Sequence, residues 1–244
     1  MKNVLRKVLL IIMAVALSMS FTACMRYLDR NNAEEVAKLL GQKYGIEFEV
    51  QSLRNRLASD KADTVTAYCY PKNNAKVIFE AVMNVERELV SDDYPVRLLE
   101  VAAKEKIEAE FSGKGIEATV AVSIACLPIT ENLLDANLTD IISAYPELSL
   151  TFTTVLCEPA DARETYDAVV ALLEELYSGN PNMSLGTTIW KYSSDAYSKC
   201  SNEMNSIPDI YKTALEQYKP ISKVNIAIVN GEINTTYETF EDNF

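Results

Sequence analysis

Apolar residues in the first half of the chain fall into two spacings, one typical of helices and one typical of strands. Helical spacing predicts a helix that begins at Asn31 or Asn32 and ends before Gly45, and a second that begins at Asp92 or Asp93 and carries Pro95 in its first turn. Alternation of apolar and polar residues predicts strands over residues 46–50, 64–70, 77–83 and 116–127.

The second half of the chain also alternates between predicted helices and strands, with different residues. Helical spacing covers residues 133–145, 161–179 and 206–218, and strand-like alternation covers residues 148–157 and 183–192. Asp161 followed three positions later by Glu164 resembles a capping box, so we expect the middle helix to begin there.

Asn230 and Gly231 form the clearest turn signal in the chain. They separate apolar alternation over residues 224–229 from that over 232–239, and this pair of residues is what a type I′ hairpin turn needs. The whole pattern predicts an α+β fold of mainly antiparallel sheets covered by helices, after an N-terminal signal helix. We expect one unit over residues 33–127 and another over 128–244 that ends in the hairpin, although one continuous sheet fits the pattern equally well.

The N-terminus has the organisation of a secretory signal. Three basic residues, Lys2, Arg6 and Lys7, precede an unbroken apolar run from Val8 to Leu17. This run is shorter than the roughly 20 residues of a membrane-spanning helix. We therefore expect residues 1–23 to be a signal peptide, with a retained membrane anchor as the alternative.

Phe21-Thr22-Ala23-Cys24 resembles the lipobox of bacterial prolipoproteins. The resemblance implies cleavage between Ala23 and Cys24 and attachment of a diacylglycerol to the Cys24 sulfur. Two acyl chains anchor a protein stably, at about 0.8 kcal/mol per buried CH₂. Residues 24–32 then form a lipidated cysteine and a short tether, and the protein lies on the extracytoplasmic face of a bacterial cell membrane. Cleavage after Ser20 without lipidation is the alternative.

A second resemblance covers about residues 33–111. The segments 43–50, 66–71 and 90–94 look like parts of uncharacterised lipoproteins and secreted proteins of Gram-positive bacteria, especially clostridia. That group implies a fold and a habitat, and it supplies no catalytic residue.

The charge of the chain argues against some partners. Without residues 1–23 the chain keeps 20 basic residues against 35 acidic ones, a net charge of −15, and residues 120–190 contain Arg163 as their one basic residue against ten acids. A surface this acidic repels phosphate backbones, and we therefore expect no nucleic-acid partner. It also leaves the lipid on Cys24 as the attachment to the membrane.

The sequence offers little of the usual catalytic chemistry. The chain has no histidine, no Ser-x-x-Lys pair and no phosphate-binding glycine loop, and we expect no cofactor and no metal. A calcium loop from Asp135 to Asp140 fails at its glycine and terminal glutamate positions. Adjacent residues on a helix point apart, so Asp92–Asp93 is interpreted as a helix start and Glu174–Glu175 as a solvated face.

Two further groups of residues are open to more than one interpretation. Cys69, Cys126, Cys157 and Cys200 form either buried thiols, which we favour, or two disulfides. Aromatic residues fall on one face of a strand at Tyr68 and Tyr70 and recur at Trp190, Tyr192 and Tyr197. They pack in the sheets or grip a sugar or peptide.

The sequence thus predicts a membrane-anchored surface lipoprotein that is not an enzyme and binds an envelope protein or peptide, with the C-terminal hairpin as one open edge for strand addition. The alternatives are a carboxylate-dependent hydrolase of an envelope polymer, which needs two acids about 5–10 Å apart in a cleft, and a ligand-capture protein for a transporter. Cys24 is the one functional residue that the sequence names.

Overall fold

The computed structural model describes residues 30–54, 63–125, 134, 138–205 and 211–244. It forms an α+β protein that divides into two compact units, Met1–Asp92 and Asp93–Phe244. Among the described residues, no helix has both the length and the apolar character to cross a membrane. The predicted signal peptide, Cys24 and residues 25–29 lie outside the described residues.

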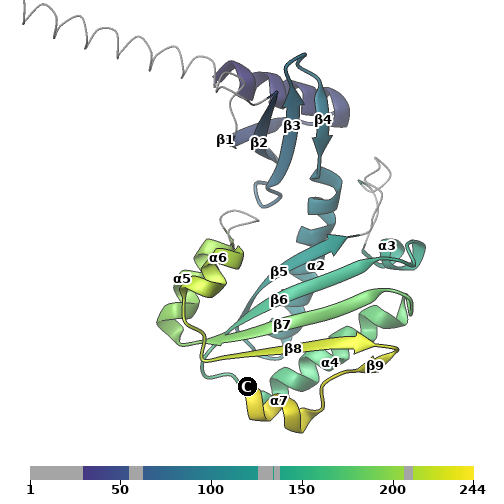
Figure 1. Cartoon of the computed structure of the whole chain (residues 1–244), viewed down its shortest axis with the longest axis vertical. Coiled ribbons are helices and arrows are strands. Elements are labelled where there is room, and N and C mark those ends of the chain that lie inside the picture. The colour runs from purple at the N-terminus through teal and green to yellow at the C-terminus, as the bar shows by residue number, and fades with distance from the viewer. Residues whose placement is uncertain (1–29, 55–62, 126–133, 135–137, 206–210) are drawn as a thin grey trace, which may run out of the picture. The chain divides into compact units, whose positions relative to one another are not determined.

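The first unit pairs a helix over residues 30–44 with a four-stranded antiparallel sheet (Figure 1). The strands follow chain order across the sheet: β1 (Phe48–Leu53), β2 (Thr64–Pro71), β3 (Phe79–Asn84) and β4 (Leu89–Asp92). Alternate residues of β2 and β3, with Cys69 and Phe79 among them, are fully buried. Leu40 of the helix is also fully buried, and the Phe48 ring packs edge-on against Phe79 at 5.6 Å. The predicted strand faces are confirmed here.

Asp92 corrects one expectation. It is the last residue of β4, a strand that sequence reasoning missed, and it does not start the following helix. The Asp92 side chain is inaccessible to solvent, and it accepts hydrogen bonds from Lys43 Nζ at 2.8 Å and Tyr44 Oη at 2.5 Å. Asp93 occupies the N-cap position of the helix without a side-chain cap. The Asp92 carboxylate therefore links the last strand of the sheet to the end of the first helix.

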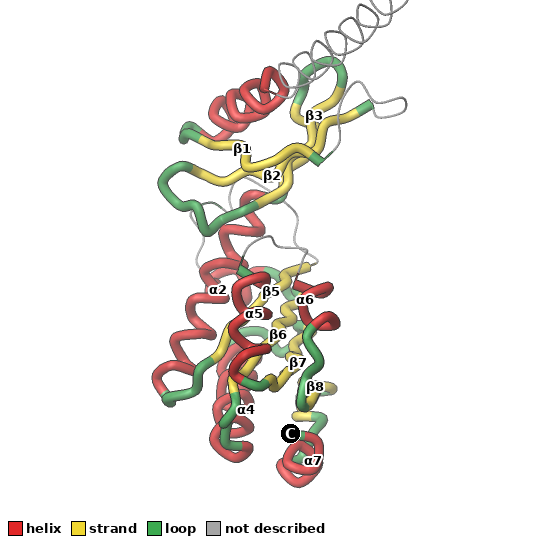
Figure 2. The backbone as a smooth tube through the Cα atoms, turned by 90° about the vertical axis from the view of Figure 1, so that its left-hand side faces the viewer, coloured by secondary structure: helices red, strands yellow, loops and turns green. Residues whose placement is uncertain are grey.

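The second unit is a five-stranded sheet with helices on both faces (Figures 1 and 2). Its strands are β5 (Ala118–Ala125), β6 (Ser149–Cys157), β7 (Ser184–Tyr192), β8 (Ser222–Val229) and β9 (Glu232–Ile233), in that order across the sheet. Neighbouring strands are antiparallel except β6 and β7, which are parallel and joined by a helical crossover. Mainly antiparallel pairing is confirmed.

Two separate apolar cores lie on opposite faces of this sheet. The larger core lies between the sheet and α2 (Tyr94–Gly113), α3 (Leu138–Ala144), α4 (Ala162–Ser178) and α7 (Tyr237–Asn243). The smaller core lies on the other face, under α5 (Ser194–Met204) and α6 (Tyr211–Gln217). β6 serves both cores, because Phe152 faces the larger and Val155 faces the smaller. Side chains that alternate along a strand make this division possible.

The boundary between the units differs from the predicted one between residues 127 and 128. α2 belongs to the second unit, because its stripe of Leu99, Ala103, Ile107 and Phe111 joins the larger core. α2 packs against β5, the strand that follows it in the chain, so the helix belongs to the same unit as that strand. The single continuous sheet is also excluded, since the described strands form two sheets. Residues 30–32 are helical, although residues 24–32 were expected to form a tether.

α2 also closes the outer edge of the sheet along β5. The backbone N–H of Ile124 donates to Glu100 Oε1 and that of Val120 donates to Glu108 Oε1, each at 2.9 Å. Eight helical residues span about 12 Å and four strand residues about 13 Å, so the two spacings match. Arg97 holds the Glu100 carboxylate from the other side, at 2.7 Å. An edge that would otherwise attract another strand is therefore occupied.

The C-terminal segment is a second correction. β9 contains two residues, and α7 replaces the remainder of the strand predicted over residues 232–239. Thr236 caps α7 by accepting from the Thr239 N–H, and the Phe240 ring of α7 is fully buried. One helix was also missed: α5 buries Tyr197, Cys200 and Met204, which recur at helical spacing.

Candidate functional site

α4 provides one wall of a groove at the edge of the second unit. Asp161 begins the helix as predicted, with its carboxylate accepting from the Glu164 N–H at 2.8 Å. The fully buried stripe of α4 faces the core, and a neighbouring flank is left half-buried or exposed. Tyr166, Val170, Glu174 and Tyr177 lie on that flank, at the three- and four-residue steps that align side chains along a helix.

The hairpin of β8 and β9 provides the opposite wall. Asn230 and Gly231 have φ values of 53° and 85°, the two positive angles of a type I′ turn, so the predicted turn is confirmed. Ile228 and Ile233 face each other across the two strands. Their half-buried side chains and that of Val170 on α4 are the apolar members of the lining, and we call these three the floor of the groove.

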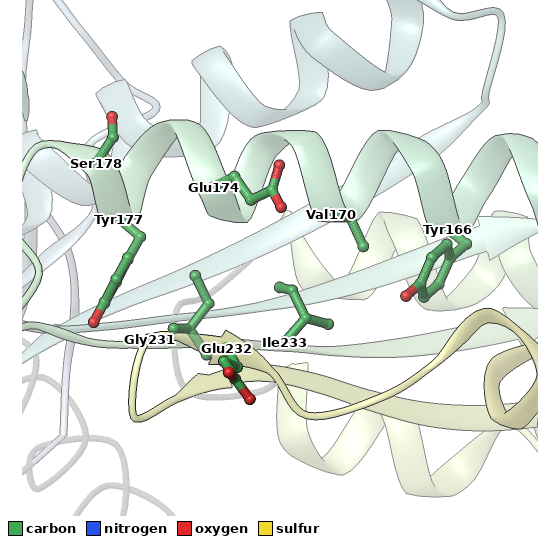
Figure 3. A pocket seen from close by; sticks show the side chains of 9 residues that line it. Tyr166, Val170, Glu174, Tyr177, Ser178, Gly231, Glu232 and Ile233 are labelled. Atoms are coloured by element: carbon green, nitrogen blue, oxygen red, sulfur yellow. The ribbon is translucent and has the colours of Figure 1, made fainter.

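We call the hollow between these walls the α4 groove (Figure 3). Its volume is about 510 Å³. Its lining consists of Tyr166, Val170, Glu174, Tyr177, Ser178, Ile228, Gly231, Glu232 and Ile233. From Tyr166 to Tyr177 the helix advances about 16 Å at 1.5 Å per residue. The groove thus follows α4 for about three helical turns.

A tyrosine stands at each end of the groove, fixed by its own hydroxyl. Tyr166 Oη donates to the Thr235 carbonyl oxygen at 2.9 Å, and Tyr177 Oη donates to that of Pro181 at 2.7 Å. The Tyr166 ring also packs against Phe240 at 5.4 Å. Burial raises the pKa of Tyr166 above its usual value, and nearby carboxylates such as Glu238 raise it further. The Tyr166 phenol is therefore protonated at neutral pH.

The charged residues that line the groove are both acidic. Glu174 and Glu232 are exposed, one on each wall. In Figure 3 the Glu174 carboxylate stays beside the helix, whereas the Glu232 carboxylate points away from it. Two carboxylates that share the work of hydrolysis must face a common point between them. The groove shows no such convergence.

The acidic pairs named from the sequence separate in the structure. Glu174 lines the groove, while Glu175 pairs with Lys106 of α2 at 2.7 Å. Asp92 is buried as described, and Asp93 pairs with Arg97 at 3.0 Å. For the calcium loop, positions 135 and 137 lie outside the described residues and Asp140 lies in the first turn of α3. Within the described ranges, no group of three or more acidic or cysteine side chains is arranged to hold a metal ion.

The aromatic residues named from the sequence are not among the residues that line the groove. Tyr68 and Tyr70 lie half-buried on one face of β2, opposite buried Cys69. Trp190 stacks with Tyr192 at 6.5 Å, with Lys223 4.3 Å above its ring. Tyr192 is fully buried and donates to the Leu215 carbonyl, so it belongs to the core.

Cys69, Cys157 and Cys200 are free thiols in the structure, while Cys126 lies outside the described residues. Burial raises the pKa of Cys200 to about 11, against the opposing effect of its hydrogen bond with Tyr192. Cys157 is half-buried, and its thiol lies 3.6 Å from Ser194 Oγ.

The C-terminal hairpin offers a shorter open edge than the sequence suggests, because β9 has two residues and the following chain folds back on β8. Beyond β9 the chain turns back, and Asn234 bonds both backbone groups of Ala227, at 2.8 and 3.0 Å. Thr235 Oγ1 then donates to the Asn225 carbonyl at 3.0 Å. These contacts occupy backbone groups of residues 225 and 227 that an added strand would need, and we place the candidate site in the groove.

Sequence reasoning did not find the α4 groove. The sequence places Tyr166 and Val170 within the helix predicted over residues 161–179, and Glu232 and Ile233 within the strand predicted over 232–239. The available signal was the flank itself, where tyrosine, valine, glutamate and tyrosine follow at steps of four, four and three residues.

Comparison with known proteins adds a likeness of fold. No family model and no curated protein sequence matches the chain. Among solved structures, a DUF5037 family protein from Ruminococcus gnavus ATCC 29149 is similar, with a TM-score of 0.62 and 18% sequence identity. The similarity covers 86% of this chain and 97% of the other. At that identity the likeness extends to the fold alone, so the chain shares the fold of the R. gnavus protein.

Proposed function

We propose that this chain is a lipid-anchored binding protein of the bacterial cell surface, without enzymatic activity, and that the α4 groove is its ligand site. The lipobox-like sequence at Cys24 supports the anchor. The groove supports the binding role, because it combines apolar side chains from both walls with polar rims, and its two carboxylates do not face each other. An envelope protein or peptide is the ligand that such a surface suits.

The anchor is tested by changing its cysteine. Cys24→Ser removes the sulfur that carries the lipid, so this variant is expected in the soluble fraction or as uncleaved precursor, whereas the wild-type chain sediments with membranes. The mass of the membrane-bound form reports the diacylglycerol directly. Retention of Cys24→Ser in membranes at the wild-type level contradicts the lipid assignment.

The groove is tested by filling it. Val170→Arg puts a long charged side chain on the apolar floor, while Ala171→Arg adds the same side chain at the next, exposed position outside the lining. Each full-length variant is used to capture partners from envelope extract, and circular dichroism checks that both fold. We expect Val170→Arg to lose the captured partner and Ala171→Arg to keep it. Equal capture by both variants contradicts the groove as ligand site.

A further inference from the structure

We infer that the α4 groove binds an extended, positively charged peptide segment of a partner polypeptide. This inference rests on the proposed function, because it takes the groove as the ligand site. It adds the chemical class of the ligand, which follows from the hydrogen-bonding state of the side chains in the lining.

Each polar side chain that lines the groove can only accept a further hydrogen bond. Glu174 and Glu232 are carboxylates, which accept and do not donate when ionised. The O–H groups of Tyr166 and Tyr177 already donate to the carbonyl oxygens of Thr235 and Pro181.

Ser178 completes this pattern, because its Oγ donates to the Glu175 carbonyl at 2.7 Å. A hydroxyl has one hydrogen to donate and two lone pairs that accept. The side chains of the groove therefore favour a ligand rich in N–H donors and disfavour carboxylates and phosphates.

Charge points in the same direction. The ionised groups in the lining are the two glutamates, and the lining contains no lysine or arginine. Lysine and arginine side chains reach across apolar surface with their stems and keep their charged ends in water. On this groove their stems would lie over the floor of Val170, Ile228 and Ile233 while their ends meet the carboxylates on the two rims.

Shape distinguishes a peptide from a small cation. Small-molecule sites enclose roughly 70–90% of the ligand surface. The α4 groove has exposed residues on both walls, such as Glu174 and Glu232, so it stays open along its length. Its length of about 16 Å matches about five residues of extended chain at about 3.3 Å each. A segment that continues beyond both ends fits this geometry better than a free amine does.

The test uses the full-length chain in detergent and three probes. A fluorescent, end-blocked Lys-Val-Lys-Val-Lys peptide is titrated by anisotropy, next to the matching Glu-Val-Glu-Val-Glu peptide and with free spermidine as a competitor. We expect the lysine peptide to bind and its affinity to fall as salt rises, since exposed charges are screened over about 10 Å at 0.1 M ionic strength. The glutamate peptide should not bind.

Variants then locate the bound peptide. Glu174→Gln and Glu232→Gln should each weaken binding of the lysine peptide by about two- to fivefold, the usual scale of an exposed ion pair. Glu175→Gln is the matched control, because it removes the same charge from the adjacent residue, which pairs with Lys106 outside the groove. It should leave the affinity at the wild-type value.

Three results overturn the inference: equal binding of the two peptides, displacement of the lysine peptide by equimolar spermidine, or an equal loss in Glu175→Gln. Failure of the proposed function has a different signature. If the lysine peptide does not bind while Val170→Arg still loses the envelope partner, the ligand class is wrong and the site stands. If Val170→Arg retains the partner, the site itself is wrong.

Discussion

Glu100 offers the sharpest test of how the second unit is held together. Glu100→Ala removes the acceptor of the Ile124 N–H at a position where Ile124 is 6% exposed. A buried donor left without a partner costs about 1–3 kcal/mol. Part of this cost is offset, because the substitution also removes a carboxylate whose burial is unfavourable. We therefore expect the free energy of unfolding to fall by about 1–2 kcal/mol at pH 7.

Glu100→Gln separates the hydrogen bond from the charge. The amide oxygen still accepts from Ile124, so the loss should be smaller than in Glu100→Ala. Burial raises the pKa of Glu100 in the folded chain, and the charge of Arg97 and the Ile124 N–H offset this only in part. The folded state thus holds the proton more tightly than the unfolded state, in which a glutamate titrates near pH 4.3. The contribution of the Glu100 carboxyl to stability therefore declines as pH rises from about 4.3 through the pKa of Glu100 in the folded chain.

The measurement uses the one tryptophan of the chain. Trp190 lies in β7 of the same sheet, so its fluorescence during urea denaturation reports the second unit. Glu110→Ala is the control, since Glu110 is exposed on the same helix, and such substitutions usually stay within about 0.5 kcal/mol. The stability of Glu100→Gln relative to wild type should rise with pH above about 4.3. A flat or falling difference, or equal losses in Glu100→Ala and Glu110→Ala, refutes this account.

Three more outcomes follow from local structure. Asp161→Ala should lower the urea stability of the second unit by about 1 kcal/mol through loss of the N-cap, while Asp167→Ala on the same helix should change it by less. Thiol labelling at pH 8 followed by peptide mass mapping should modify half-buried Cys157 before buried Cys200, whose pKa is about 11, and the reverse order contradicts the described burial. Gly231→Ala should cost about 1 kcal/mol in thermal unfolding, because φ is 85° there, and an unchanged melting temperature speaks against the turn.

The elements that were predicted correctly are those with a strong local signal. The Asp161 cap and the Asn230–Gly231 turn each depend on neighbouring residues, so the sequence alone specifies them. The buried face of β2 could also be predicted from the sequence, since the alternation of apolar and polar residues indicates which side of a strand meets the core.

The misses required knowledge of distant partners. The predicted strand over residues 232–239 stops after Ile233, because the Thr236 cap and the buried Phe240 favour a helix on the core. β4 is a four-residue strand whose Asp92 is stabilised by Lys43, 49 positions earlier. The α4 groove arises where lining residues 50 to 67 positions apart in the chain meet, and the flank of α4 alone does not show that the hairpin lies opposite it.

The buried Asp92 carboxylate also bears on the order in which the chain folds. Its partners Lys43 and Tyr44 end the first helix, so the contact closes only after every strand of the first unit is available. Chains are made from the N-terminus, and domains generally fold as units in that order. The ion pair between Lys43 and Asp92 therefore marks the earliest length at which the first unit is complete, before any residue of the second unit is needed.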